Sequence, residues 1–166
     1  MIKTIPLVFA LLLTLSFAAH AQNVIRFVDV DGHEKQITAA DLLKLKRVSA
    51  TASAHGQAGN FSGYNLGDVL TLAGVELGEK LRGARLASFL LVEAADGYQI
   101  IFALPELDPG FTNKQVLLVD TQDGKPLPKD QGPYRLVVPG EKRPARWARQ
   151  VTTLKVVSVA TPRPAK

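Results

Sequence analysis

Cysteine is absent from this 166-residue chain. Its absence excludes disulfide bonds, thiolate nucleophiles, thiolate metal ligands and redox dithiols, so stability must come from packing. Histidine is also scarce, with three in the sequence, and the separated His33 and His55 do not predict a metal site. No Ser-His-Asp motif and no glycine-rich phosphate loop at a strand-to-helix junction is recognisable. The common hydrolase and nucleotide-binding classes are therefore not indicated.

The first residues have the pattern of a secretory signal peptide. Lys3 is followed by an apolar stretch at residues 5–18, which is short for a bilayer span. Residues 19–21 read Ala-His-Ala, the small-x-small pattern of a signal-peptidase site, so we expect cleavage after Ala21. An uncleaved N-terminal anchor is the alternative. The predicted location is the periplasm or the cell exterior, with no membrane-spanning segment after cleavage.

Residues 22–160 predict one domain without repeats or an internal linker, followed by a disordered tail at residues 161–166. Residues 22–124 hold nine basic and thirteen acidic side chains, whereas residues 125–166 hold ten basic and two acidic ones. The cationic final third favours an anionic small molecule, a membrane surface or an acidic protein partner, with a solvated basic face as the alternative. Nucleic acid is not predicted, because aromatic residues do not alternate with the basic ones.

Strand patterns dominate the sequence. Short helices are predicted after the capping residue Thr38 and at residues 66–73, where Gly74 ends the helix. Residues 55–60 are polar and glycine-rich, and we expect them to form a loop. The fold class is therefore α+β, mostly β with mixed sheets and two or three short helices. Strands are expected at residues 24–30, 35–37, 46–52, 85–94, 98–103, 115–120, 132–140 and 151–159.

The segment that matters most for function is residues 132–140, which read Gly-Pro-Tyr-Arg-Leu-Val-Val-Pro-Gly. An apolar run with a Gly-Pro or Pro-Gly pair at each end predicts a strand that is buried on both faces. Arg135 in its middle needs a partner, because an unpaired buried charge is very costly. The partner is either a core carboxylate such as Asp68 or Asp96, or an anionic ligand.

Five segments in a fixed order carry a family resemblance. They are residues 61–74 (Phe-Ser-Gly-Tyr-Asn-Leu-Gly-Asp-Val-Leu-Thr-Leu-Ala-Gly), 95–98 (Ala-Asp-Gly-Tyr), 123–127 (Asp-Gly-Lys-Pro-Leu), 132–139 and 146–149 (Arg-Trp-Ala-Arg). Their order and spacing, across roughly residues 24–160, resemble the oxidoreductase molybdopterin-binding domain, which has the fold of sulfite oxidases and their periplasmic relatives. The resemblance implies a mostly β domain of that fold.

The resemblance also implies oxygen-atom transfer at molybdenum, which the family holds through a cysteine thiolate on the loop after one strand. Here that strand is residues 47–53, and the corresponding place, residues 50–55, contains no cysteine. Serine and alanine do not replace a soft thiolate ligand to a high-valent metal. We therefore predict no metal and no resident cofactor, and molybdopterin is an expectation from the resemblance alone.

Five residues are candidates for binding an anionic ligand or a pterin. By the resemblance, Arg135 matches the arginine of the family's Gly-Pro-x-Arg strand, and Arg149 stands where the family usually has lysine. Both could grip a phosphate or carboxylate. His55 could be a ligand or an acid-base group, or a solvated loop histidine. Trp147 could contact a ligand or cap the core beneath stacked arginines, and Tyr134 could line a cleft or be a half-buried ring.

Three functions are compatible with these observations. The first, which we favour, is a periplasmic binding or accessory module that holds an anionic ligand or a protein partner without molybdenum catalysis. The second is a diverged oxidoreductase that keeps a pterin cofactor. The third is a purely structural interaction domain, which would show an exposed apolar patch and no small-molecule pocket. The sequence leaves open whether the chain is an enzyme, and we expect that it is not.

Overall fold

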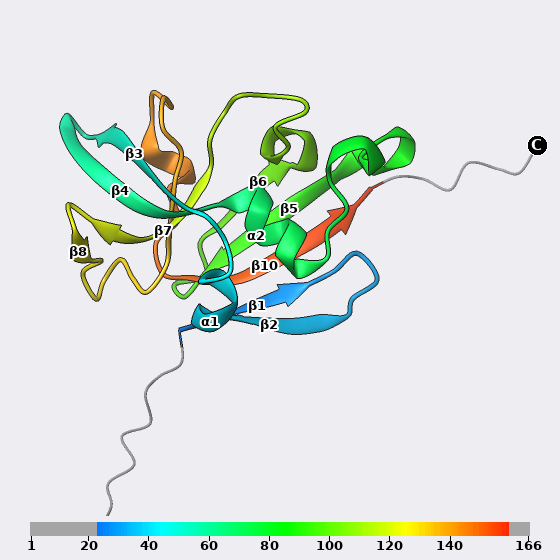
Figure 1. Ribbon diagram of the computed structural model, residues 1–166, viewed down its shortest axis with the longest axis horizontal. Coiled ribbons are helices and arrows are strands. Elements are labelled where there is room, and N and C mark those ends of the chain that lie inside the picture. The colour runs from blue at the N-terminus through cyan, green and yellow to red at the C-terminus, as the bar shows by residue number, and fades with distance from the viewer. Residues whose placement is uncertain (1–22, 160–166) are drawn as a thin grey trace, which may run out of the picture.

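The computed structural model describes residues 23–159, and the strands among them form two sheets (Figure 1). The first sheet has the order β2-β1-β10-β5-β6. The second has the order β3-β4-β7-β8, and β9 pairs with β7. The first sheet consists of β1 (Val24–Val28), β2 (Glu34–Thr38), β5 (Ser88–Ala94), β6 (Gln99–Ala103) and β10 (Val151–Ser158). The second consists of β3 (Arg47–Ala54), β4 (Gln57–Asn65), β7 (Leu117–Gln122), β8 (Lys125–Pro126) and β9 (Arg135–Val137).

Helices are short and few in the described part of the chain. The α-helices are α1 (Ala39–Leu42) and α2 (Leu66–Ala73). Single turns of 3-10 helix are η1 (Gly78–Lys80), η2 (Gly83–Ala87), η3 (Leu104–Leu107) and η4 (Pro144–Arg146). β1 pairs in parallel with β10 and antiparallel with β2, so the first sheet is mixed. The mostly β, α+β prediction is therefore confirmed.

One apolar core joins the two sheets. Figure 1 shows the second sheet on the left and the first on the right, with α2 between them. Fully buried side chains come from both sheets and from α2, among them Ile25, Leu90, Leu70 and Leu118. Because the sheets share this core, a pocket on either one is held by the packing of the whole domain.

Both α-helices begin as their capping residues predict. Thr38 accepts a hydrogen bond from the N–H of Asp41, whose carboxylate accepts one from the N–H of Thr38, which completes a capping box. Asn65 caps α2 by accepting from the N–H of Gly67 at 2.9 Å. Gly74 ends α2 in the left-handed conformation, with φ of 100°.

The expected loop at residues 55–60 is wrong. Only His55 and Gly56 form a turn, and residue 57 already begins β4, which pairs with both β3 and β7. Glycines lowered the strand signal, but Gly63 is needed there, because a Cβ would overlap the Leu118 carbonyl oxygen of β7. The close approach of two backbones therefore explains a glycine that the sequence pattern alone does not.

Several strand boundaries also differ from the prediction by one to three residues, and the two largest differences are these. The strand expected at 85–94 begins at Ser88, because residues 83–87 form η2. The strand expected at 132–140 is hydrogen-bonded to β7 only over residues 135–137. Its burial is nevertheless as predicted, since every residue from Tyr134 to Val138 is buried.

Two predictions fall outside the described residues. These are the signal peptide at residues 1–21 and the disordered tail at residues 161–166. Within residues 23–159, no helix is long and apolar enough to cross a membrane.

Candidate anion-binding site

A cavity of about 570 Å³ opens beside the β3–β4 hairpin, next to the turn between β7 and β8 and to the start of β9. Its size is within the range of small-molecule sites. We call it the arginine pocket. It is lined by Ala54, His55, Gln57, Ala58, Gly59, Phe61, Gln122, Asp123, Gln131, Arg135 and Arg149.

His55 reaches this pocket from the tip of the β3–β4 hairpin. His55 and Gly56 have φ of 52° and 78°, and they connect the paired residues Ala54 and Gln57. Positive φ at both positions is the geometry of a two-residue turn whose twist matches that of the flanking strands. The tight turn therefore places the imidazole at the pocket wall.

Arg135 lies at the base of the pocket on β9. Pairing with Val119 of β7 fixes its position in the second sheet, and the residue is only 7% exposed. Its Nη1 donates to the side-chain oxygen of Gln131. Its Nε is buried and has no hydrogen-bond partner among the described residues. A buried guanidinium with an unused donor is costly unless a further group satisfies it.

Two aromatic rings hold the Arg135 guanidinium in place. It lies 5.7 Å from the centroid of the Phe61 ring and 5.4 Å from that of Trp147. The two rings meet edge to face, with centroids 5.6 Å apart. The Trp147 indole N–H donates to the Val138 carbonyl at 3.2 Å, which fixes the ring. Cation–π contacts orient the guanidinium but do not neutralise its charge.

Arg149 adds a second positive charge to the same pocket. Burial lowers the pKa of Arg135, repulsion from Arg149 lowers it further, and Asp130 opposes the shift. An arginine nevertheless remains protonated at neutral pH. Over residues 23–159 no carboxylate forms an ion pair with either Arg135 or Arg149. The pocket therefore presents two arginine side chains whose charges are not paired within the described chain.

The interpretation of Arg135 as the partner of a core carboxylate is wrong for both residues that we considered. Asp96 instead accepts from the backbone N–H of Tyr98 at 2.9 Å. Asp68 is exposed in the first turn of α2. Strand register decides this outcome, because it sets which side chains face Arg135.

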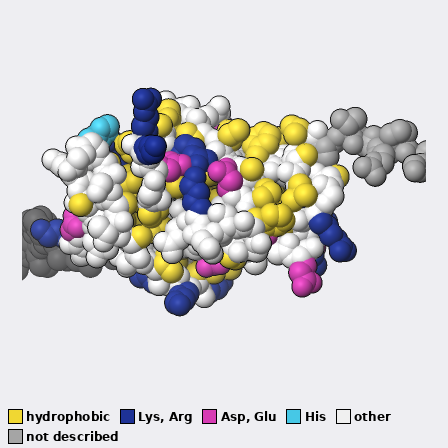
Figure 2. Space-filling model, turned by 90° about the horizontal axis from the view of Figure 1, so that it is seen from above, with side chains coloured by type: hydrophobic (Ala, Val, Ile, Leu, Met, Phe, Trp, Pro, Cys, Tyr) yellow, Lys and Arg dark blue, Asp and Glu magenta, His cyan; other side chains and the backbone are white. Residues whose placement is uncertain are grey.

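Arg146 shows what an internally paired arginine looks like in this fold. It donates to Glu141 and Glu106 and stacks on Phe102, 4.3 Å from the ring centroid. Lys114 pairs with the same two carboxylates. Figure 2 shows basic and acidic side chains next to one another on the face seen from above, with apolar side chains gathered beside them. Not every arginine of the basic final third is therefore available to a ligand.

The structure brings three of the five candidate residues to one cavity. These are His55, Arg135 and Arg149. Trp147 is 4% exposed and contacts the Arg135 guanidinium without lining the pocket. Tyr134 does not line it either: it is 3% exposed, its hydroxyl lies 3.5 Å from the Asn23 carbonyl, and burial raises its pKa to about 12. Successive residues of an extended strand point to opposite faces, which separates Tyr134 from Arg135.

Sequence reasoning missed four polar groups of the pocket. Gln57, Gln122 and Gln131 contribute amides, and Asp123 contributes the one carboxylate of the lining. Asp123 accepts from the N–H of Asn60 at 2.9 Å. Glutamine carries no distinctive sequence signal, and only the position of Gln131 just before the Gly-Pro pair could have drawn attention to it.

A neighbouring hollow of about 500 Å³ extends the basic surface past His55. It is lined by His55, Gly56, Lys142, Arg143, Pro144 and Ala145. The imidazole therefore lies where the two cavities share a wall. The local geometry defines the class of protein: a two-sheet α+β domain with a cavity that carries two arginines without carboxylate partners in the described chain.

The family follows from comparison with known proteins. The family model described as the oxidoreductase molybdopterin binding domain matches residues 20–164. The chain belongs to this family, as its motifs suggested. No curated protein matches it.

A solved structure shows the same fold. The crystal structure of the sulfane dehydrogenase SoxCD from Paracoccus pantotrophus matches with a TM-score of 0.60 at 18% sequence identity. The match covers 83% of this chain but only 39% of that one. This likeness establishes the architecture, and the present chain corresponds to less than half of that protein's chain.

The pocket does not fit molybdenum held in the way that the family resemblance implies. The resemblance places the metal-binding thiolate at residues 50–55, and the last two of these, Ala54 and His55, line the arginine pocket. The donor atoms available there are imidazole, amide, guanidinium and one carboxylate, and the chain contains no cysteine. A soft thiolate is therefore missing where the metal needs it. The arginines do suit a phosphate or carboxylate group.

Proposed function

We propose that this chain is a non-catalytic binding module that holds a small anion of the phosphate or carboxylate class in the arginine pocket. The observation that carries the proposal is the buried Arg135, which has an unused Nε donor and no carboxylate partner in the described chain. An anion would supply both the missing acceptor and the missing charge. Arg149 and His55 also line the pocket and would contact the same anion.

The shape of the surface favours an anion with more than one charged group. The arginine pocket adjoins the hollow that carries Lys142 and Arg143, and His55 belongs to both. A ligand that spans the two cavities gains charge-assisted hydrogen bonds at both ends. Pyrophosphate is therefore expected to bind more tightly than phosphate.

We further propose that the module works in the periplasm or outside the cell. This rests on the signal-peptide pattern of residues 1–21. Mass spectrometry of protein recovered from the periplasm should give a chain that begins at Gln22. A chain that retains residue 1 would contradict this part of the proposal.

Calorimetric titration with phosphate and pyrophosphate tests the binding function. Arg135→Met should weaken binding by at least about tenfold, because it removes charge-assisted hydrogen bonds and keeps the apolar bulk. Arg146→Met is the matched control: it removes a guanidinium of the basic segment that is already paired, so binding should not change. Arg149→Gln should weaken binding, and the exposed Arg82→Gln should not.

Two results would overturn the proposal. One is equal affinity in Arg135→Met and in the unmodified protein. The other is molybdenum at about one atom per chain in protein purified from a molybdopterin-producing host. That result would favour a diverged oxidoreductase with a metal site that does not use a thiolate.

A further inference from the structure

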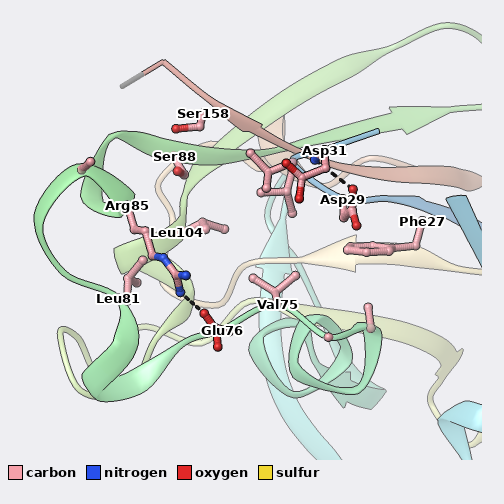
Figure 3. Close-up of a pocket in the computed structure, with 15 residues that line it drawn as sticks. Phe27, Asp29, Asp31, Val75, Glu76, Leu81, Arg85, Ser88, Leu104 and Ser158 are labelled. Carbon is pink, nitrogen blue, oxygen red and sulfur yellow. Dashed lines mark hydrogen bonds and ion pairs between the residues drawn. The ribbon is translucent and has the colours of Figure 1, made fainter. Parts of the chain in front are cut away.

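A second cavity, of about 490 Å³, lies at one end of the first sheet (Figure 3). It opens between the ends of β1 and β10, the C-terminal end of α2 and the segment 76–88. We call it the apolar pocket. It is lined by Phe27, Asp29, Val30, Asp31, Ala73, Gly74, Val75, Glu76, Leu81, Ala84, Arg85, Ser88, Leu104, Val156 and Ser158. It shares no lining residue with the arginine pocket.

Its walls are made of the hydrophobic core itself. Phe27 and Leu81 are each 2% exposed, and Leu104 and Val156 are also buried, yet all four border the cavity. Figure 3 shows Val75 between Phe27 on one side and Leu81 on the other. Walls of this kind bind the apolar body of a ligand, because filling them removes hydrocarbon surface from water.

A serine hydroxyl supplies a polar anchor within these walls. Ser88 is 7% exposed and lines the cavity, and no hydrogen bond of its hydroxyl is found within residues 23–159. Figure 3 shows it on the same side of the pocket as Arg85 and Leu104. A ligand group that bonds to this hydroxyl replaces the water that otherwise solvates it, and the bond fixes the orientation of the ligand in the pocket.

The rim of the apolar pocket is acidic. Glu76 is already paired with Arg85 and with Lys80. Asp29 and Asp31 lie across the cavity from that ion pair, at the end of β1 (Figure 3). Asp29 contacts the exposed His33 ring at 3.0 Å, and no basic side chain pairs with Asp31 in the described chain. The uncompensated charge at this mouth is therefore negative.

We propose that the apolar pocket binds a small organic amine with an apolar ring system. The ring system would fill the space between Val75 and Leu81. The ammonium group would lie at Asp29 and Asp31, and a polar group of the ligand would reach Ser88. This proposal does not depend on the arginine pocket, because no residue is common to the two linings.

Three probes of similar size and different charge test the proposal: tryptamine, tryptophol and indolepropionate. Affinities come from NMR titrations of the isotope-labelled chain, which also show where each probe binds. Tryptamine should bind about twofold to fivefold more tightly than tryptophol, as expected for a solvent-screened ion pair. Indolepropionate should bind to this pocket most weakly. Shifts should centre on Ser88 and Leu81.

Variants test the apolar cavity and the acidic rim separately. Ala84 is exposed and lines the cavity, so Ala84→Phe should fill it without disturbing the core and weaken all three probes at least tenfold. Asp31→Asn should remove the preference for tryptamine over tryptophol. The matched control is Asp68→Asn, which removes a carboxylate from α2 outside this lining and should leave the preference intact.

Clear results would overturn the proposal. They are the absence of binding by all three probes, equal affinity of the amine and the alcohol, or full affinity in Ala84→Phe. Shifts centred on His55 rather than Ser88 would equally contradict it. A loss of pyrophosphate binding in Arg135→Met bears only on the arginine pocket, so the two proposals fail separately.

Discussion

The arginine pocket belongs to the second sheet and the apolar pocket to one end of the first, and they differ in what their walls leave unpaired. In the arginine pocket the unpaired group is a buried cation, Arg135. In the apolar pocket it is a carboxylate of the rim, Asp31, which no basic side chain pairs with in the described chain. The comparison shows that one small core can support two cavities whose unpaired charges have opposite signs.

The pairing of charges explains the difference. Arg146 and Arg85, like the other arginines that have carboxylate partners, are internal or surface ties. Arg146 also stacks on an aromatic ring, but Arg135 has aromatic rings and no carboxylate partner in the described chain. Rings orient a cation but leave its charge available to a ligand. The two pockets therefore differ because the fold pairs some charged side chains with opposite charges and leaves others unpaired.

The largest expected effect is that of Gly63→Ala. A Cβ at this position overlaps the backbone of β7, so the free energy of unfolding should fall by about 3 kcal/mol. Because the sheets share one core, Trp147 fluorescence and hydrogen exchange in β5 should report the same loss. A change confined to Trp147 would show that the two pockets sit on separately folding units. Ser62→Ala is a neighbouring control with a small expected effect.

The next largest expected effect is a difference in the free energy of unfolding between two arginine variants. Arg146→Met leaves Glu141 and Glu106 with Lys114 as their remaining partner, and the loss of its charge-assisted hydrogen bonds should lower the free energy of unfolding by about 2 kcal/mol. Arg135→Met, measured without added anion, should leave stability unchanged or raise it by about 1 kcal/mol, because it removes an unpaired buried charge. Urea titrations measure both. Equal destabilisation by the two variants would mean that Arg135 has a carboxylate partner within the protein after all.

Lowering the pH should weaken the stabilisation from the paired Arg146 and Glu141, and it should not change the contribution of the unpaired Arg135. Burial by itself would raise the pKa of Glu141, but hydrogen bonds from Arg146 and Lys114 outweigh it and hold the pKa below its ordinary value of 4.5. The stability that Glu141 contributes is therefore present above pH 4.5 and is lost as the pH falls through the folded-state pKa. Glu141→Gln should destabilise the protein at neutral pH, and its deficit should shrink in acid.

Arg135→Met is the comparison for this experiment. Since no carboxylate pairs with Arg135 in residues 23–159, its effect on stability should be the same on both sides of that transition. Thermal unfolding followed from neutral to acidic pH measures both variants. A deficit of Glu141→Gln that stays constant with pH would contradict the assignment.

The smallest expected effect is that of Asp123→Asn. The carboxylate is the one negative side chain of the arginine pocket, and asparagine keeps both the oxygen that bonds Asn60 and tolerance of the positive φ of 50°. Pyrophosphate should bind about twofold to threefold more tightly, and the gain should fall with added salt. Weaker binding in calorimetry would show that Asp123 contacts the ligand instead of repelling it.

Much of the local structure could be predicted from sequence because its causes are local. Thr38 and Gly74 mark helix ends through their own side chain or conformational freedom, and the Gly-Pro and Pro-Gly pairs delimit the buried segment of β9. The family could be identified because its motifs lie in a fixed order. The full length of β4 was missed because its glycines lower the strand signal, and one of them, Gly63, has a tertiary cause, the close approach of the β7 backbone.

What the sequence alone determined is the absence of a thiolate and the presence of an arginine inside a buried strand. Only the tertiary structure decided that Arg135 meets Phe61, Trp147 and Gln131 instead of a carboxylate, and that His55 and Arg149 join it at one cavity. The physical reason is register. Which side chains face one another across paired strands depends on contacts between residues that are distant in the chain, and a shift of one residue reverses every face.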